Sequence, residues 1–108
     1  ELGDGILGAY GVEAILAEPD IRKSLTAVVL SANDPVAAWG GVKLLRERFD
    51  IEPCAVTGPA TDNAVGVNII QDQMGVRAVN AMGAGAELGD HLIESLGLGA
   101  KLAQAAAE

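Results

Sequence analysis

The spacing of hydrophobic residues changes within the segment from Thr26 to Phe49. Residues 27–30 form a continuous apolar run with two valines, which is typical of a parallel strand that is buried on both faces. Asp34 followed by Pro35 suits the N-cap and the first position of a helix. The segment is therefore predicted to form a strand, a polar turn and a helix with one buried face. The buried face is expected to consist of Ala38, Val42, Leu45 and Phe49.

Similar units of strand, turn and helix follow at intervals of roughly 25 residues. Cys54–Thr57 is the next predicted strand, and Val76–Asn80 is a third, shorter one. A helix that ends near Gly75 is predicted between them, and another is predicted around Leu88. Strands that alternate with helices predict a parallel sheet. We therefore expect an α/β fold with a three-layer, Rossmann-like open parallel sheet and helices on both faces.

The chain is long enough for one domain with a modest core. Residues 1–108 are accordingly expected to form a single α/β domain, with Lys101–Glu108 as an Ala-rich last turn or a frayed tail. A fragment of a larger protein is the alternative interpretation, because the sequence starts without a methionine.

The charge and the composition narrow the classes of partner and compartment. A net charge of −8 argues against a nucleic-acid backbone or an anionic membrane as the main partner. A phosphorylated small ligand stays open, because backbone N–H groups at a helix start bind phosphate without a basic surface. Cys54 is the only cysteine, so no internal disulfide can form and a reducing cytosol is expected. We find no secretory or transmembrane pattern, and the expectation is a cytoplasmic protein.

The three predicted strands end in polar turns, which right-handed crossovers would place at the same edge of the sheet. In open α/β sheets, ligands bind at that edge. The turns supply hydroxyls, amides and carboxylates that can hydrogen-bond a sugar, a base or an amide, but they contain no lysine, arginine, histidine or cysteine. No catalytic residue is therefore assigned. The candidate ligand-binding residues, called the rim below, are Ser31, Asn33, Asp34, Thr57, Gly58, Thr61, Asp62, Asn63 and Asn80.

Five of the rim residues also have a purely structural interpretation. Asp34, and either Thr61 or Asp62, can serve as helix caps, and Asn33 and Asn63 can be turn residues. The sequence leaves both interpretations open.

The opening Glu1–Gly5 places acidic residues among glycines, at the end of an apparent strand. Glu1 and Asp4 are candidate ligands for Mg²⁺, directly or through water, and a surface turn is the alternative. His91 has no second histidine or cysteine nearby, which favours a surface helix position over a metal site. Trp39 is either a core residue or an anchor that faces a partner.

The order of motifs resembles one known family. The opening ELGDGILG is similar to the acidic, Gly-rich strand end found midway through dethiobiotin-synthetase-like P-loop ATPases. A helix, the strand AVVL, a second helix and the strand CAVT follow in a similar order, over Glu1 to Asn80. The resemblance implies that Glu1 and Asp4 serve the Mg²⁺-nucleotide, with ATP as cofactor. The sequence has no G-x-x-x-x-G-K-[ST], so the chain would be the C-terminal part of such an enzyme, with the phosphate loop upstream or on another chain.

Three functions are consistent with these patterns. The first is a Rossmann-like portion of a nucleotide-dependent ligase or transferase, which predicts an exposed sheet edge or apolar face where the missing N-terminal domain docks. The second is a small non-catalytic module that binds a metabolite or nucleotide at the rim. The third is a structural or oligomerisation domain, in which the rim residues are caps. A small-molecule ligand is expected in the first two cases, and a homo-oligomer is compatible with all three.

Overall fold

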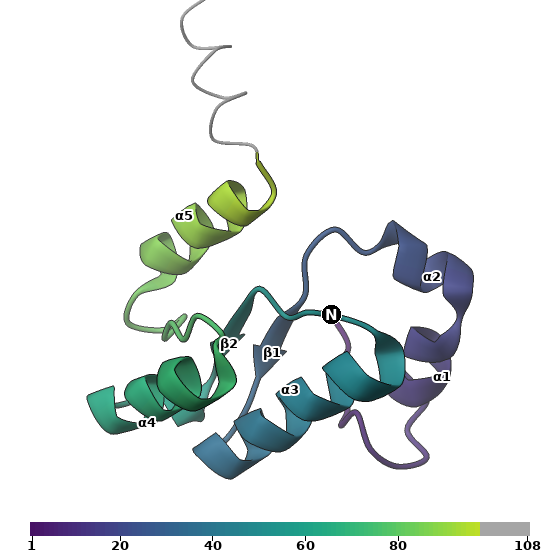
Figure 1. Ribbon diagram of the computed structural model, residues 1–108, viewed down its shortest axis with the longest axis horizontal. Helices are drawn as coiled ribbons and strands as arrows, with labels where there is room; N and C mark the ends of the chain where they lie inside the picture. The colour runs from purple at the N-terminus through teal and green to yellow at the C-terminus, as the bar shows by residue number, and fades with distance from the viewer. Residues whose placement is uncertain (98–108) are drawn as a thin grey trace, which may run out of the picture.

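The computed structural model describes residues 1–97 of the chain (Figure 1). It is a mixed α/β structure that is mostly helical and contains a small parallel sheet. The predicted last turn at Lys101–Glu108 lies outside the described residues. In chain order the elements are α1 (Val12–Ala17), α2 (Pro19–Ser24), β1 (Val29–Ser31), α3 (Pro35–Phe49), β2 (Ala55–Thr57), the 3₁₀ turn η1 (Pro59–Thr61), α4 (Ala64–Ile69), the π-helical turn η2 (Ile70–Met74) and α5 (Gly85–Ser95).

The predicted parallel pairing is confirmed for two strands, but the three-layer Rossmann-like sheet is not formed by residues 1–97. The expected third strand is reduced to one bridge, between Val56 and Ala78. Its length is limited because the chain turns at Asn80, whose side chain accepts the backbone N–H groups that follow it. β2 therefore lies between β1 and this bridge. The register of the two strands pairs Val29 with Ala55, Leu30 with Val56 and Ser31 with Thr57.

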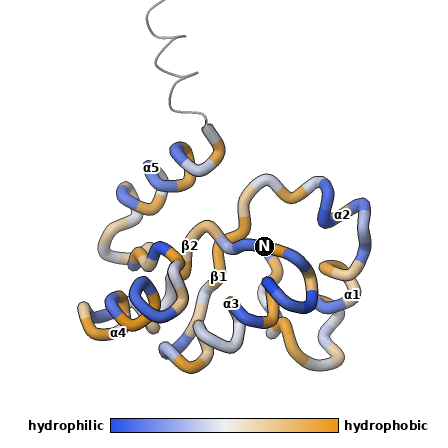
Figure 2. Tube along the Cα trace, viewed as in Figure 1, coloured by the Kyte–Doolittle hydropathy of each residue, from blue (hydrophilic) through white to orange (hydrophobic). Residues whose placement is uncertain are grey.

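Helix α3 forms as predicted and packs on the sheet. Asp34 is its N-cap, since Oδ1 accepts the N–H of Ala37 at 2.8 Å. Hydrophobic and hydrophilic residues alternate along this helix (Figure 2), and its four predicted inward residues are all buried. A Cβ added at Gly41 would lie 2.7 Å from Cδ2 of Leu30, so this glycine allows the helix to approach β1 closely. Its neighbour Gly40 has no such contact.

Strand β1 is less buried than its sequence predicts. The run at residues 27–30 was expected to be covered on both faces, yet Val29 is 36% exposed and Ser31 is exposed as well. The reason is that β1 is an edge strand and α3 covers the face of Leu30 alone. Backbone groups of Val28 and Ala32 bond to the β2 segment, so those of Val29 and Ser31 point away from it. No hydrogen bond joins these outward groups to another segment of residues 1–97.

The remaining helices flank this unit. Val12 and Leu16 of α1 are buried in the same core cluster as α3. Helix α5 is anchored by His91, which was expected at the surface but is half-buried, with Nε2 2.7 Å from the carbonyl oxygen of Cys54. Trp39 lies on the exposed side of α3 and is not a core residue. No helix of the described part of the chain is both long and apolar enough to cross a membrane.

Candidate functional site

The three strand-exit turns lie together at one edge of the sheet. The N–H of Ala60, in the second turn, donates to the carbonyl of Ala32, in the first, at 3.0 Å. The third turn is joined to the second by the N–H of Ala81, which donates to Oγ1 of Thr57 at 3.0 Å. The rim is thus a connected structure, and its residues reach the same edge from three separate segments.

Gly58 brings the first two turns into direct contact. Its backbone has φ 90° and ψ −172°, a conformation that is essentially restricted to glycine. A Cβ at this position would lie 2.7 Å from both Oγ of Ser31 and the carbonyl oxygen of Ala32. The residue is therefore required by the geometry of the rim, and it brings backbone rather than a side chain to Ser31.

The capping residue of α4 differs from the prediction. Neither Thr61 nor Asp62 caps this helix, because η1 extends the turn and the helix begins only at Ala64. Asn63 is the N-cap, and its Oδ1 accepts the N–H of Gly66 at 2.9 Å. Thr61 is 3% exposed, and its hydroxyl donates to the carbonyl of Gly58 at 2.7 Å. The polar groups of Asn63 and Thr61 are therefore used within the fold.

Asn80 organises the third turn. Its Oδ1 accepts the N–H groups of Met82 and Gly83 at 3.0 and 2.8 Å, which is a local Asx-type turn. Its Nδ2 donates to Oδ1 of Asp62 at 2.8 Å and joins the third turn to the second. The second carboxylate oxygen of Asp62 has no hydrogen bond within residues 1–97, and the same holds for the side chains of Ser31 and Asn33. These three residues are the ones best placed to meet a ligand.

The charges of the rim limit the ligands that suit it. Asp34 and Asp62 are exposed carboxylates, and the three turns contain no basic residue. A sugar hydroxyl or the N–H of a base or amide can donate to these oxygens, whereas a bare phosphate group would be repelled. The three turns contain no histidine, lysine or cysteine that could activate a rim hydroxyl or act as a nucleophile itself.

The predicted Mg²⁺ ligands Glu1 and Asp4 are exposed and lie in an irregular segment, not at the end of a strand. Within residues 1–97, no three side chains of histidine, cysteine, aspartate or glutamate are close enough together to hold a metal ion. A Mg²⁺ ion at Glu1 and Asp4 would therefore depend on water or on ligand phosphates for its other ligands.

Sequence reasoning missed the apolar residues that border the rim. Val36, Val65 and Met82 are all strongly exposed, with Met82 reaching 97%. Each follows a capping or turn residue of the rim by two positions, after Asp34, Asn63 and Asn80 respectively. This repeated spacing is visible in the sequence. Val36 and Val65 lie in the first turns of α3 and α4, and Met82 lies in the turn before α5.

The sequence matches no protein-family model, and the chain matches neither a curated protein nor a solved structure.

Proposed function

We propose that this chain is part of a nucleotide-dependent ligase or transferase of the P-loop type, and that its rim binds the nucleoside or another polar substrate. The observation that carries the proposal is the meeting of three strand-exit turns at one edge of a parallel sheet. Open α/β proteins bind ligands at this edge. Ser31, Asn33 and Asp62 supply polar atoms there that the fold leaves available.

ATP and Mg²⁺ are the cofactors that the proposal implies. The rim suits the nucleoside end of ATP, whose hydroxyls and amino group donate hydrogen bonds, and it does not suit the bare phosphates. The phosphates would be bound by a phosphate loop outside these 108 residues, since the sequence contains none. Glu1 and Asp4 would hold the Mg²⁺ ion, which neutralises phosphate charge when bound.

The uncovered edge of β1 supports the view that the chain belongs to a larger protein. Val29 and Ser31 direct unpaired backbone groups outward along an uncharged, apolar strand. Such an edge is suited to pair with a further strand, from an N-terminal domain or from another copy of the chain. We retain a cytoplasmic location in the proposal, because the single cysteine suits a reducing compartment.

The natural gene is expected to encode a glycine-rich phosphate loop ending in Lys-Ser or Lys-Thr, within roughly one domain length upstream of Glu1. The measurement is the coding sequence on that side. A start codon directly before Glu1 would contradict the enzyme proposal and would favour a small, non-catalytic binding module.

Asn33→Ala is expected to weaken the binding of adenosine to the chain by about fivefold to tenfold, because it removes one hydrogen bond of roughly 1 kcal/mol. Binding is measured by titrating adenosine and following the backbone amide resonances of Ser31 and Gly58. Asn68→Ala is the matched control, since Asn68 is an exposed asparagine on α4 that is not part of the rim. Equal affinity of both variants, or no movement of the rim resonances, would place the ligand elsewhere.

A further inference from the structure

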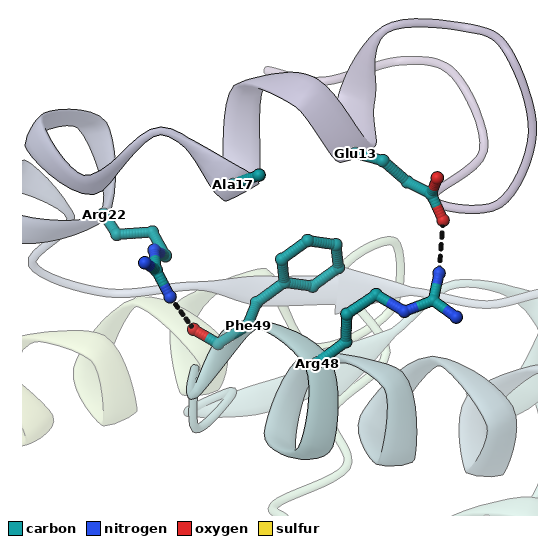
Figure 3. Close-up of a pocket in the computed structure, with 5 residues that line it drawn as sticks. All are labelled: Glu13, Ala17, Arg22, Arg48 and Phe49. Atoms are coloured by element: carbon teal, nitrogen blue, oxygen red, sulfur yellow. Dashed lines mark hydrogen bonds and ion pairs between the residues drawn. The ribbon is translucent and has the colours of Figure 1, made fainter.

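A shallow pocket of about 310 Å³ lies at the opposite end of α3 from the rim (Figure 3). Helix α3 begins beside the rim and ends at Phe49, and 15 residues of helix span about 22 Å. The pocket is therefore separate from the proposed nucleoside site and does not depend on it. It is lined by residues of α1, α2 and the end of α3: Glu13, Ala17, Arg22, Arg48 and Phe49.

Arg22 enters this pocket with half of its guanidinium unpaired. Its Nη1 donates to the carbonyl oxygen of Phe49 at 3.0 Å, where it satisfies a group at the C-terminal end of α3. Its Nε is buried without a hydrogen-bond partner, and Nη2 makes no hydrogen bond within residues 1–97. Buried donors without an acceptor are rare in folded proteins. Nε and Nη2 form the edge of arginine that binds the two oxygens of a carboxylate or phosphate.

Arg48 brings a second guanidinium to the pocket from α3. Its Nη1 lies 2.6 Å from Oε1 of Glu13, and both side chains remain partly exposed to solvent. An exposed ion pair of this kind holds its partners weakly, so Arg48 can turn toward another anion at little cost. Figure 3 places the ring of Phe49 between the two arginines, with Ala17 on the facing helix.

The balance of charge in the pocket differs from that of the chain. Two of the seven basic residues line it against one carboxylate, so it is positive in a protein whose net charge is −8. Guanidinium groups suit a small anion with oxygen atoms in one plane, such as a carboxylate, or with several oxygens, such as a phosphate.

We propose that this pocket binds a small oxyanion, a carboxylate or a phosphate group, between Arg22 and Arg48. Because Nε is buried, binding requires the side chain of Arg22 to rotate and expose its Nε and Nη2 to the anion. Arg48 supplies the second positive charge as it exchanges its ion pair with Glu13.

The test is an NMR titration with sodium phosphate and sodium acetate, against sodium chloride at matched ionic strength. The expected result is a saturable movement of the Arg22 Nε–H resonance with phosphate, acetate or both, but not with chloride. Stronger binding of phosphate indicates a phosphorylated ligand, and stronger binding of acetate indicates a carboxylate. A movement that does not saturate, or that chloride reproduces, would overturn the proposal.

Arg22→Lys is expected to weaken binding about tenfold or more, because lysine keeps the charge and lacks the planar pair of donors. Arg46→Lys is the matched control on α3, since Arg46 is paired with Glu52 and does not line the pocket. If Arg22→Lys loses its folded spectrum, Arg48→Gln replaces it, because Arg48 is exposed and its exposed ion pair is expected to contribute little to stability. An oxyanion that binds Arg48→Gln or a folded Arg22→Lys as tightly as the parent chain would contradict the proposal.

Discussion

Gly58→Ala is expected to lower the free energy of unfolding by about 3–5 kcal/mol and to abolish ligand binding at the rim. Two independent costs combine at this position. The backbone conformation excludes side chains, which costs on the order of 1–3 kcal/mol for a residue other than glycine. The new Cβ would also lie 2.7 Å from the carbonyl oxygen of Ala32, and relieving that overlap must separate the first two turns.

Gly75→Ala separates these two costs. Gly75 also has a positive φ, of 67°, but a Cβ added there would meet no atom within 4 Å. Gly75→Ala should therefore lower the free energy of unfolding by the conformational cost alone, about 1 kcal/mol. Urea denaturation of both variants measures the difference. If Gly58→Ala costs no more than Gly75→Ala, the first two turns are not held by the close contact at Gly58.

The parts of the fold that the sequence predicts are those specified by neighbouring residues. Asp34 followed by Pro35 identifies the start of α3, because a cap and a proline act within one helical turn. Gly75 ends the following helical segment in the left-handed conformation, as predicted. The parallel pairing of β1 and β2 follows from the helix between them, since parallel neighbours require a crossover.

The parts of the fold that the sequence does not predict depend on distant or competing interactions. The third strand is cut short because Asn80 binds the N–H groups that follow it, and this turn competes with pairing to β2. Asn63 rather than Asp62 caps α4 because a 3₁₀ turn intervenes, and its length is not encoded by the capping residues themselves. The exposure of Val29 depends on which face of β1 the helix α3 covers, and α3 covers the face of Leu30.

The two candidate sites differ in the same way: one is specified by local sequence and topology, and the other depends on contacts between distant residues. The meeting of the three turns was predictable because two of them follow the paired strands and the third follows the bridge at Ala78, and topology places them at one edge. The oxyanion pocket was not predictable, because its contacts join Arg22 to Phe49 and Arg48 to Glu13 across separations of 27 and 35 residues. Neither pair has a spacing that marks a shared helix face or strand, so the pocket emerges only when α1 and α2 pack against the end of α3.

Gly66→Ala is expected to destabilise the chain by about 3 kcal/mol or more, through backbone overlap rather than through conformation. Gly66 is buried near the start of α4, and a Cβ there would collide with the carbonyl oxygen of Ala60 in η1. Backbone cannot rotate aside as a side chain can, so α4 and η1 must move apart. The N–H of Ala60 bonds to Ala32, and its displacement would also loosen the connection between the first two turns of the rim.

Gly89→Ala is the control for this effect, because Gly89 lies inside α5 and an added Cβ would meet no atom within 4 Å. Alanine there should stabilise the helix by about 0.5–1 kcal/mol. Denaturant unfolding gives the change in the free energy of unfolding for each variant. The amide resonance of Ala60 reports whether the connection between the first two turns of the rim is disturbed. Gly66→Ala should shift that resonance strongly, whereas Gly89→Ala should leave it in place. A stable Gly66→Ala variant with an unmoved Ala60 amide would mean that η1 and α4 are not packed backbone to backbone, and the second turn of the rim would then need another source of support.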